Sequence, residues 1–364
     1  MKIIMTGGGT GGHIYPAIAI ADEIARRRPE AEIMFVGTEK GLEKSIVPEH
    51  GYPIKFVKAS GLDRKRLLKN ISVLAELRAG IKEAKLIMEE FRPDMIIGTG
   101  GYVCGPVALA GRKLGVKIYI HEQNATPGLT NKLLAKHADK IFLGFEEAGT
   151  RFKDKGKLIF SGNPVRRSFY DPDRKKARAA LGISEDSFMI LSFGGSQGAA
   201  RINEVMTTVA AVISGVDNFV LFLVTGRRYY DKILRDFEDK RIQRGEAMRI
   251  LPYMDEADVY LAACDVAISR AGAITVSEIA VSGRPAILIP SPNVTGNHQF
   301  FNAKALADKG RAELIEEKSL NAEGVINTII RMKNDGGNRA ESAGAGGRAI
   351  NGTAVDIICE NIGI

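Results

Sequence analysis

Short apolar runs alternate with longer segments of helical periodicity along the first half of the chain. The apolar runs cover residues 2–5, 32–36, 95–97, 117–120, 140–143 and 158–160, and helical segments fall between them. This alternation of strand and helix predicts a parallel sheet with helices on both of its faces.

The same rhythm restarts near Phe188. Strands are predicted at 188–193, 219–224, 248–251, 265–268 and 286–289, again separated by helical segments. A polar, proline-containing stretch at 161–182 is typical of a linker that enters a new first helix, and the boundary between the halves is expected near 161–173. The sequence therefore predicts two α/β domains, each a Rossmann-like, doubly wound parallel sheet, with a ligand cleft between them.

We place the first domain at residues 1–162 and the second at 163–340. Residues 341–364 form a tail that ends in a predicted helix at 352–361. The sequence leaves open whether this tail packs back on the first domain. A chain of 364 residues suits two domains of ordinary size.

The net charge of +8 and the isoelectric point of about 9.2 favour anionic partners such as phosphates, acidic membrane surfaces or nucleic acid. The three cysteines, Cys104, Cys264 and Cys359, lie too far apart for a disulfide framework or a zinc site, so we expect reduced, buried thiols. We expect neither a signal peptide at the N-terminus nor a membrane-spanning helix.

Glycine-rich loops follow three of the predicted strands. Residues 7–12 (GGGTGG) open a helix predicted at 14–28, residues 98–102 read GTGGY, and residues 194–198 read GGSQG. Glycine lets the backbone approach a phosphate closely, and a helix N-terminus presents free N–H groups to it. Such loops in both halves favour two phosphorylated ligands, one for each domain.

The first loop taken alone also fits a nicotinamide- or flavin-dependent oxidoreductase, with Glu39 holding the ribose at the end of the second strand. His13 directly after the loop is unusual for that class, and the loop at 194–198 would need its own ligand. A nucleic-acid-binding protein is the non-enzyme alternative, but aromatic residues do not interleave with the basic segments. The sequence contains neither a Walker-type loop nor a spaced His/Cys metal cluster.

Seven segments in order along the chain resemble the MurG family of bacterial UDP-N-acetylglucosamine transferases. They are GGTGGHIYP at 8–16, GGYVCGP at 100–106, HEQNATPG at 121–128, GNPVR at 162–166, GGSQGA at 194–199, SRAGAITVSE at 269–278 and HQFFNA at 298–303. One departure stands out, because some family members carry two adjacent glutamines where this chain has His298 and Gln299.

This resemblance implies a GT-B fold and an inverting glycosyltransferase. The donor would be UDP-GlcNAc and the acceptor lipid I, the undecaprenyl-diphosphate-linked MurNAc-pentapeptide. Transfer to the 4-hydroxyl of MurNAc would give lipid II for peptidoglycan. The resemblance also implies a peripheral protein on the cytoplasmic face of the plasma membrane, without a nucleic-acid partner. No cofactor is expected, and the sequence leaves open whether a loosely bound divalent cation assists the leaving diphosphate.

The resemblance also assigns residues to the two substrates. The expected donor-binding residues are Thr10, Gly11, Gly12, Asn124, Arg166, Ser196, Met254, Ala273, Ile274, Thr275, Glu278, His298 and Gln299. The expected acceptor-binding residues are Gly8, Gly9, Gly100, Gly101 and Tyr102. Within the donor set, Glu278 would hold the ribose hydroxyls and Arg166 a phosphate oxygen.

His13 is our first candidate for the base that activates the acceptor hydroxyl. The positive end of the adjoining helix disfavours the imidazolium, and a neutral imidazole can accept a proton. A role limited to hydrogen bonding with substrate or loop fits its position equally well. Glu122 is the reserve candidate.

The stretch 61–85 has an apolar stripe with basic flanks. Its apolar residues at helical spacing are Leu67, Leu68, Ile71, Leu74, Leu77 and Ile81. Such a helix can face the core of its own domain or lie in an anionic membrane interface. The lipid-linked acceptor favours membrane contact, with part of the stripe in the core.

Overall fold

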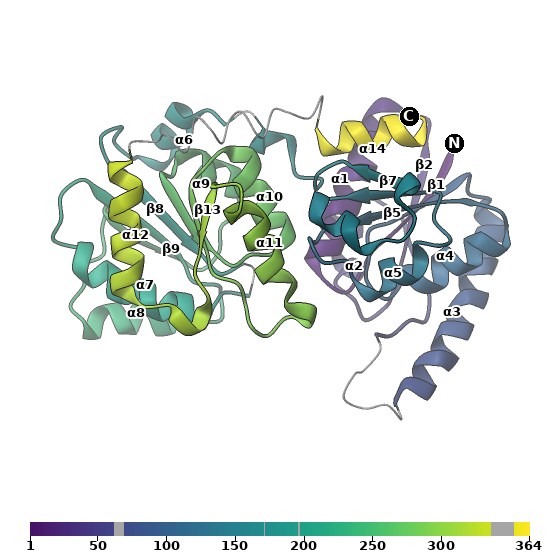
Figure 1. Cartoon of the computed structure of the whole chain (residues 1–364), viewed down its shortest axis with the longest axis horizontal. Coiled ribbons are helices and arrows are strands. Elements are labelled where there is room, and N and C mark those ends of the chain that lie inside the picture. The colour runs from purple at the N-terminus through teal and green to yellow at the C-terminus, as the bar shows by residue number, and fades with distance from the viewer. Residues whose placement is uncertain (62–68, 171, 196, 336–352) are drawn as a thin grey trace. The chain divides into compact units, whose positions relative to one another are not determined.

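The computed structural model describes residues 1–61, 69–170, 172–195, 197–335 and 353–364, and side chains are described for all of these except 69–71. The chain forms two compact units. The first joins Met1–Val165 to the C-terminal end of the chain, and the second begins at Arg166. In each unit helices cover both faces of one parallel sheet (Figure 1), which confirms the predicted fold class.

The first unit has a seven-stranded sheet in the order β3-β2-β1-β4-β5-β6-β7. Its strands are β1 (Lys2–Thr6), β2 (Glu32–Gly37), β3 (Ile54–Phe56), β4 (Met95–Gly98), β5 (Lys117–Glu122), β6 (Lys140–Leu143) and β7 (Leu158–Phe160). Its helices are α1 (Gly11–Arg27), α2 (Glu43–Glu49), α3 (Lys69–Phe91), α4 (Cys104–Lys113), α5 (Leu129–Leu134) and α14 (Ala354–Ile362), with 3₁₀ turns η1 (Glu146–Arg151) and η2 (Lys155–Lys157).

The second unit has a six-stranded sheet in the order β10-β9-β8-β11-β12-β13. Its strands are β8 (Phe188–Phe193), β9 (Phe219–Val224), β10 (Met248–Leu251), β11 (Val266–Ser269), β12 (Ala286–Leu288) and β13 (Ala312–Leu314). Its helices are α6 (Arg174–Leu181), α7 (Ala200–Ile213), α8 (Tyr230–Asp239), α9 (Ala257–Ala263), α10 (Ala273–Ser282), α11 (His298–Ala307) and α12 (Ala322–Asn334), with 3₁₀ turns η3 (Arg167–Phe169), η4 (Thr295–Asn297) and η5 (Glu317–Ser319).

The two sheets share one topology, in which the chain winds outward from a central strand in both directions. The strand order reverses between β1 and β4 in the first unit and between β8 and β11 in the second. Ligands of open α/β sheets bind at such switch points, outside the carboxyl ends of the strands. The glycine loops follow β1, β4 and β8, so they lie at these two places.

The central strands were predicted because they are almost continuously buried, as in β1 and β8. The edge strands β3 and β13 were missed. Each is three residues long and contains a charged residue, in the sequences IKF and AEL. A short edge strand that carries a charge has little apolar pattern to detect.

The C-terminal helix α14 packs against α1 in the first unit. Ile358, Cys359 and Ile362 lie in the same buried cluster as the apolar face of α1. The Arg27 guanidinium pairs with Asp356, and the Lys140 ammonium donates to the Asn361 carbonyl at 2.6 Å. These contacts close the first unit with a segment from the far end of the sequence.

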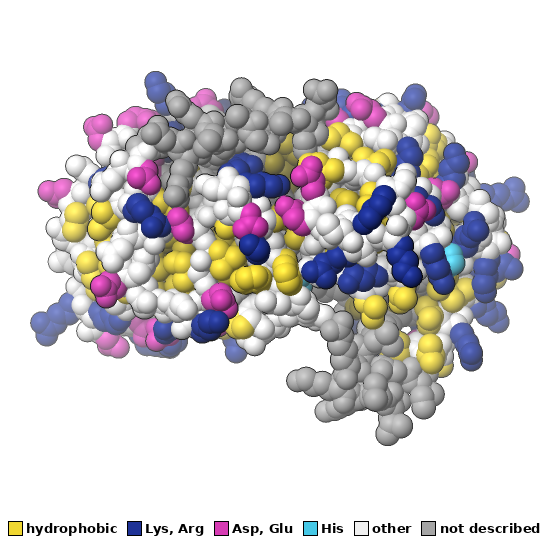
Figure 2. Space-filling view, in the orientation of Figure 1, with side chains coloured by type: hydrophobic (Ala, Val, Ile, Leu, Met, Phe, Trp, Pro, Cys, Tyr) yellow, Lys and Arg dark blue, Asp and Glu magenta, His cyan; other side chains and the backbone are white. Residues whose placement is uncertain are grey.

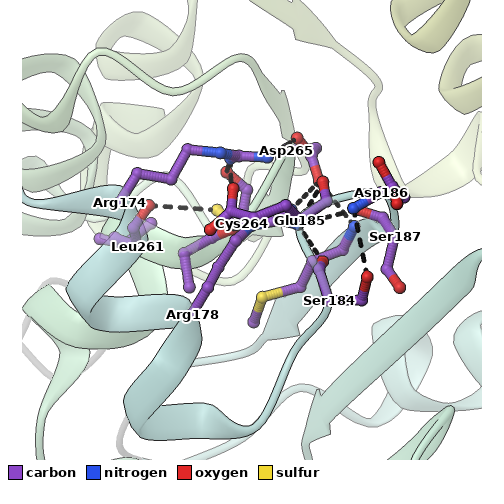
Figure 3. Close-up of polar contacts among 11 residues, drawn as sticks. Arg174, Arg178, Ser184, Glu185, Asp186, Ser187, Leu261, Cys264 and Asp265 are labelled. Atoms are coloured by element: carbon purple, nitrogen blue, oxygen red, sulfur yellow. Dashed lines mark hydrogen bonds and ion pairs between the residues drawn. The ribbon is translucent and has the colours of Figure 1, made fainter.

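A buried arginine anchors the second unit at the amino ends of its central strands (Figure 3). Arg178 on α6 is 0 % exposed, and its Nη2 donates to Asp265 Oδ2 at 2.6 Å. Its Nη1 donates to the carbonyls of residues 184, 185 and 187. Asp265 also accepts hydrogen bonds from Arg174 Nη2 at 2.6 Å and from the Met189 N–H at 2.7 Å. Every charge in this network is therefore paired or hydrogen-bonded.

The three cysteines are free and buried, as the sequence predicted. Within the described residues, none of the helices combines the length and the apolar character that a bilayer span requires.

Candidate functional site

The glycine loops after β1 and β4 interlock at the switch point of the first unit. The Gly8 N–H donates to the Gly100 carbonyl at 3.3 Å. A Cβ at Gly101 would lie 2.3 Å from the Gly8 oxygen, and a Cβ at Gly7 would lie 2.0 Å from Thr99 Oγ1. These glycines are therefore required by the contact between the two loops, whether or not a phosphate is bound.

A buried carboxylate that sequence reasoning missed supports the first loop. Glu43 is 1 % exposed, and its Oε2 accepts the Gly9 N–H at 3.0 Å. Its Oε1 accepts the N–H and the hydroxyl of Thr38 at 3.0 and 2.8 Å. The signal in the sequence is the pair Gly37 and Gly41 near Glu43, since a Cβ at Gly37 would clash with the Glu43 Cγ and one at Gly41 with the carboxylate.

This arrangement changes what the first loop can bind. The N–H groups of Gly8 and Gly9 are already hydrogen-bonded within the protein, and the Glu43 carboxylate beside them repels a pyrophosphate. That geometry disfavours a dinucleotide held at Gly8 and Gly9. Helix α1 begins next to them at Gly11, without a side-chain cap from Thr10, and the N–H groups of Gly11 and Gly12 meet no acceptor among the described residues. An anion could therefore be held at residues 11–12, at the α1 end of the loop.

His13 lies against both loops with one ring nitrogen engaged. Its Nδ1 is 3.1 Å from the Thr99 carbonyl and 3.2 Å from Gln123 Oε1. Both partners are acceptors, so Nδ1 carries a proton, and in the neutral ring Nε2 therefore keeps its lone pair. A Cβ at Gly100 would lie 2.8 Å from Nδ1, so the bare backbone of Gly100 makes room for the ring. Tyr102 of the same loop packs over Gly9.

Glu122 is buried, and both of its oxygens hold the loop that follows β5. Oε1 accepts the backbone N–H of Asn124 at 3.0 Å and its side-chain amide at 3.2 Å. Oε2 accepts the Gly128 N–H at 2.9 Å and the Asn131 amide at 2.8 Å. Four donors on one buried carboxylate favour a role in positioning Asn124 over a role as a base.

The glycine loop after β8 is a tight turn in the second unit. Gly195 and Gly198 have φ angles of +79° and +71°, and a Cβ at Gly198 would lie 2.1 Å from the Thr225 carbonyl. Helix α7 follows it and has no side-chain cap. Ser196, the predicted phosphate donor of this loop, lies outside the described residues.

Helix α10 begins at Ala273, as predicted, at the other side of the second switch point. Its first helical hydrogen bond runs from the Val276 N–H to the Gly272 carbonyl at 2.9 Å. The N–H groups of Ala273, Ile274 and Thr275 meet no acceptor among the described residues. This end of α10 can therefore hold an anion.

Glu278 lies one turn further along α10, beside the pair formed by Arg166 and Asp258. Burial raises the pKa of the Glu278 carboxyl to about 7, while the Arg166 charge lowers it and Asp258 raises it further. Arg166 Nη2 lies 3.4 Å from Asp258 Oδ1, and its guanidinium stacks on Phe169 at 5.2 Å. Arg166 is 56 % exposed, so it can exchange Asp258 for a phosphate oxygen.

The start of α11 presents two polar side chains with defined orientation. His298 Nδ1 donates to the Thr295 carbonyl at 2.9 Å, so in the neutral ring Nε2 is the acceptor. Gln299 Oε1 accepts the Ser291 N–H at 2.9 Å, which turns its amide NH₂ outward from that contact. Met254 follows Tyr253. The Arg227 guanidinium lies over the Tyr253 ring, with its Cζ 5.3 Å from the ring centroid.

The structure thus groups the predicted residues by unit. In the first unit His13, Gly8, Gly9, Gly100 and Tyr102 lie together; in the second, Glu278 and Arg166 do. No cluster of three metal-ligating side chains occurs in the part of the chain that the structure describes.

Comparison with known proteins decides the family. The chain matches the glycosyltransferase family 28 N-terminal domain over residues 3–143 and the family 28 C-terminal domain over residues 189–352. The chain belongs to glycosyltransferase family 28. It is therefore a glycosyltransferase, and the alternatives of an oxidoreductase and a nucleic-acid-binding protein find no support in these comparisons.

Relatives within family 28 carry a more specific name. A protein of Alkaliphilus metalliredigens is 46 % identical over 338 residues, which is 92 % of this chain and 91 % of that protein. A protein of Bacillus subtilis is 41 % identical over 332 residues, or 91 % of this chain and 90 % of that protein. Both are named UDP-N-acetylglucosamine--N-acetylmuramyl-(pentapeptide) pyrophosphoryl-undecaprenol N-acetylglucosamine transferase.

A solved structure of the same family has the same fold. The crystal structure of Acinetobacter baumannii MurG is 25 % identical, covers 99 % of both chains and superimposes with a TM-score of 0.76. Together with the named relatives, it confirms the resemblance to the MurG family and the GT-B fold.

Proposed function

We propose that this enzyme transfers GlcNAc from UDP-GlcNAc to the 4-hydroxyl of MurNAc in lipid I, giving lipid II for peptidoglycan synthesis. Relatives with that name match nine tenths of the chain at 41–46 % identity. The observation that carries the mechanism is that His13 uses its Nδ1 for hydrogen bonds, while its Nε2 meets no partner among the described residues, in the first turn of α1.

His13 acts as the general base in this account. Its Nε2 takes the proton of the acceptor hydroxyl as that oxygen attacks C1 of GlcNAc. The bond between C1 and the diphosphate oxygen breaks, and UDP leaves with the electron pair. Attack on the face opposite the leaving group inverts the anomeric carbon, and the imidazolium then releases its proton to solvent.

Backbone N–H groups and arginine stabilise the diphosphates in this account. The N-terminus of α10, at Ala273, Ile274 and Thr275, and the loop that contains Ser196 hold the UDP diphosphate, with Arg166 as an added cation. Gly11 and Gly12 bind a phosphate oxygen beside His13. Gly8, Gly9, Gly100 and Gly101 act through the shape of the interlocked loops, and Tyr102 covers them.

Further side chains contact the rest of the donor in this proposal. Glu278 accepts hydrogen bonds from the ribose hydroxyls, and the backbone at Met254 meets the uracil. His298 and Gln299 bind the sugar hydroxyls, and Asn124, fixed by Glu122, binds the GlcNAc.

Release of UDP that depends on a soluble lipid I analogue tests the function. We expect UDP and the disaccharide product in equal amounts. In the same assay His13→Ala lowers kcat by about 10²- to 10⁴-fold, the range for loss of a general base, while the affinity for UDP-GlcNAc stays within about threefold.

The matched control is His137→Ala, a half-exposed histidine of the same unit. A folded wild-type enzyme that releases no UDP with the analogue would refute the function. Near-normal turnover of His13→Ala would remove His13 from the role of base.

The raised pKa of Glu278 gives donor binding a pH dependence. Ribose hydroxyls need the carboxylate as acceptor, and with a pKa of about 7 that form is about one tenth populated at pH 6 and about nine tenths at pH 8. We therefore expect the UDP-GlcNAc affinity measured by calorimetry to rise about tenfold from pH 6 to pH 8.

Two variants test whether Glu278 causes this pH dependence. Glu278→Gln should bind UDP-GlcNAc weakly and without the pH dependence. Asp258→Asn should move the midpoint of the affinity–pH curve to lower pH, because Asp258 raises the pKa of Glu278. A wild-type affinity that stays flat across this range would contradict the role of Glu278.

We further propose that the face of the first unit with α3, α4 and α5 contacts the anionic cytoplasmic leaflet of the plasma membrane. On α5, Leu133 is 59 % exposed between Lys132 and Lys136, and on α3, Leu74 is 56 % exposed. Figure 2 shows Lys and Arg side chains gathered over α4 and α5, with apolar side chains near α3. Ile81 instead packs on the core; Leu67 and Leu68 lie outside the described residues.

Liposome co-sedimentation tests this contact. Lys132→Glu together with Lys136→Glu should reduce binding to phosphatidylglycerol-containing vesicles at least tenfold, since each basic residue near such a surface contributes about 1 kcal/mol. Added salt should weaken wild-type binding in the same direction. The control is Lys175→Glu with Lys176→Glu, an exposed pair on α6. Equal loss in both double variants would argue against this face.

A further inference from the structure

A one-way chain of hydrogen bonds runs from the backbone of the first unit to the candidate base. It links the Gly162 carbonyl, His121, Gln123 and His13. We propose that Gln123 and His121 are positioning residues that fix the tautomer of His13 and so keep its Nε2 free to accept a proton. The proposal rests on the function proposed above and adds how the base is held ready.

The direction of these hydrogen bonds is set at the Gly162 end, where the acceptor is a backbone carbonyl. His121 is 0 % exposed, and its Nε2 lies 3.0 Å from the Gly162 carbonyl, which can only accept. Nε2 therefore carries the proton. Burial lowers the pKa of His121 to about 4, so the ring is neutral at physiological pH and its Nδ1 is an acceptor.

The side-chain amide of Gln123 donates to His121 and accepts from His13, so it keeps the same direction. Its Nε2 lies 2.9 Å from His121 Nδ1 and 3.2 Å from the His121 carbonyl, and both of these atoms are acceptors. The NH₂ group is thus fixed on the His121 side, and Oε1 is turned toward His13. Gln123 is 1 % exposed, and its own carbonyl receives the Asn163 amide at 3.0 Å. The side chain therefore has one favourable orientation.

His13 is the last donor in this series of hydrogen bonds. Its Nδ1 meets Gln123 Oε1 at 3.2 Å and the Thr99 carbonyl at 3.1 Å, so the proton must reside on Nδ1. Thr99 is itself held by its N–H to the Thr6 carbonyl at 2.8 Å. In a neutral imidazole the hydrogen bond of one nitrogen decides the protonation of the other. The chain therefore removes the tautomer that would place a proton on Nε2 and block the base.

The partner of His13 is a neutral amide, although a carboxylate stands next to it in sequence. Glu122 is turned to four donors of its own loop. A carboxylate against Nδ1 would stabilise the imidazolium and slow its release of the proton after transfer. Gln123 orients the ring without adding a charge, which suits a base that must be regenerated in every turnover.

Nitrogen-15 NMR of the wild-type enzyme labelled at its five histidines tests the tautomers directly. In long-range proton–nitrogen spectra at pH 8 we expect His13 with its proton on Nδ1 and His121 with its proton on Nε2. Variants that replace the histidines one at a time assign the signals. A wild-type His13 with its proton on Nε2 would overturn the proposal.

Two variants of Gln123 then test the link to catalysis. Gln123→Leu removes the acceptor, so we expect mixed tautomers at His13 and a kcat about tenfold lower, with the KM for UDP-GlcNAc within about threefold. Gln123→Glu keeps an acceptor facing Nδ1, so it retains the tautomer and moves the acid limb of the pH–rate profile to higher pH. Unchanged tautomer and kcat in Gln123→Leu would refute the positioning role.

These readouts separate two kinds of failure. The NMR measurement needs no substrate, so it reports on the hydrogen-bond chain whatever the enzyme transfers. A wild-type enzyme with the expected tautomers but no lipid I-dependent UDP release would refute the proposed function and leave the chain established.

Discussion

The architecture of the candidate site in the first unit depends on one steric constraint, the absence of side chains where the loops after β1 and β4 meet. Gly7 abuts Thr99, Gly101 abuts the Gly8 carbonyl, and Gly100 lies under the ring of His13. Because these contacts leave no space for a Cβ, the two loops can close on each other at the switch point of the sheet. His13 is then held through its Nδ1 by the Thr99 carbonyl and Gln123.

This constraint gives the glycines a different meaning from the one suggested by the sequence. A glycine-rich loop before a helix indicates phosphate binding, and that inference places the ligand along the whole loop. The structure divides the loop into two parts. The N–H groups of Gly8 and Gly9 donate to Gly100 and Glu43, whereas those of Gly11 and Gly12, at the start of α1, meet no acceptor among the residues that the structure describes.

Much of the fold could be predicted because buried central strands and helix starts have local signatures. The strands of both sheet centres and the start of α10 at Ala273 follow from apolar runs and turn residues alone. Features that depend on contacts distant in sequence could not be predicted. Examples are the packing of α14 on α1, the return of Glu43 to Gly9, and the orientation of Gln123 between two histidines. The edge strands were missed because they are short and carry a charge.

Close packing of the loops, rather than glycine flexibility alone, positions His13, the proposed base. Gly100→Ala against Gly115→Ala tests it, since both glycines have positive φ but only Gly100 has an atom of His13 within reach of a Cβ. We predict that Gly100→Ala loses at least about tenfold in kcat with unchanged UDP-GlcNAc affinity, as expected for a displaced base, while Gly115→Ala keeps its turnover. Equal turnover of a folded Gly100→Ala enzyme and the wild type would contradict the account.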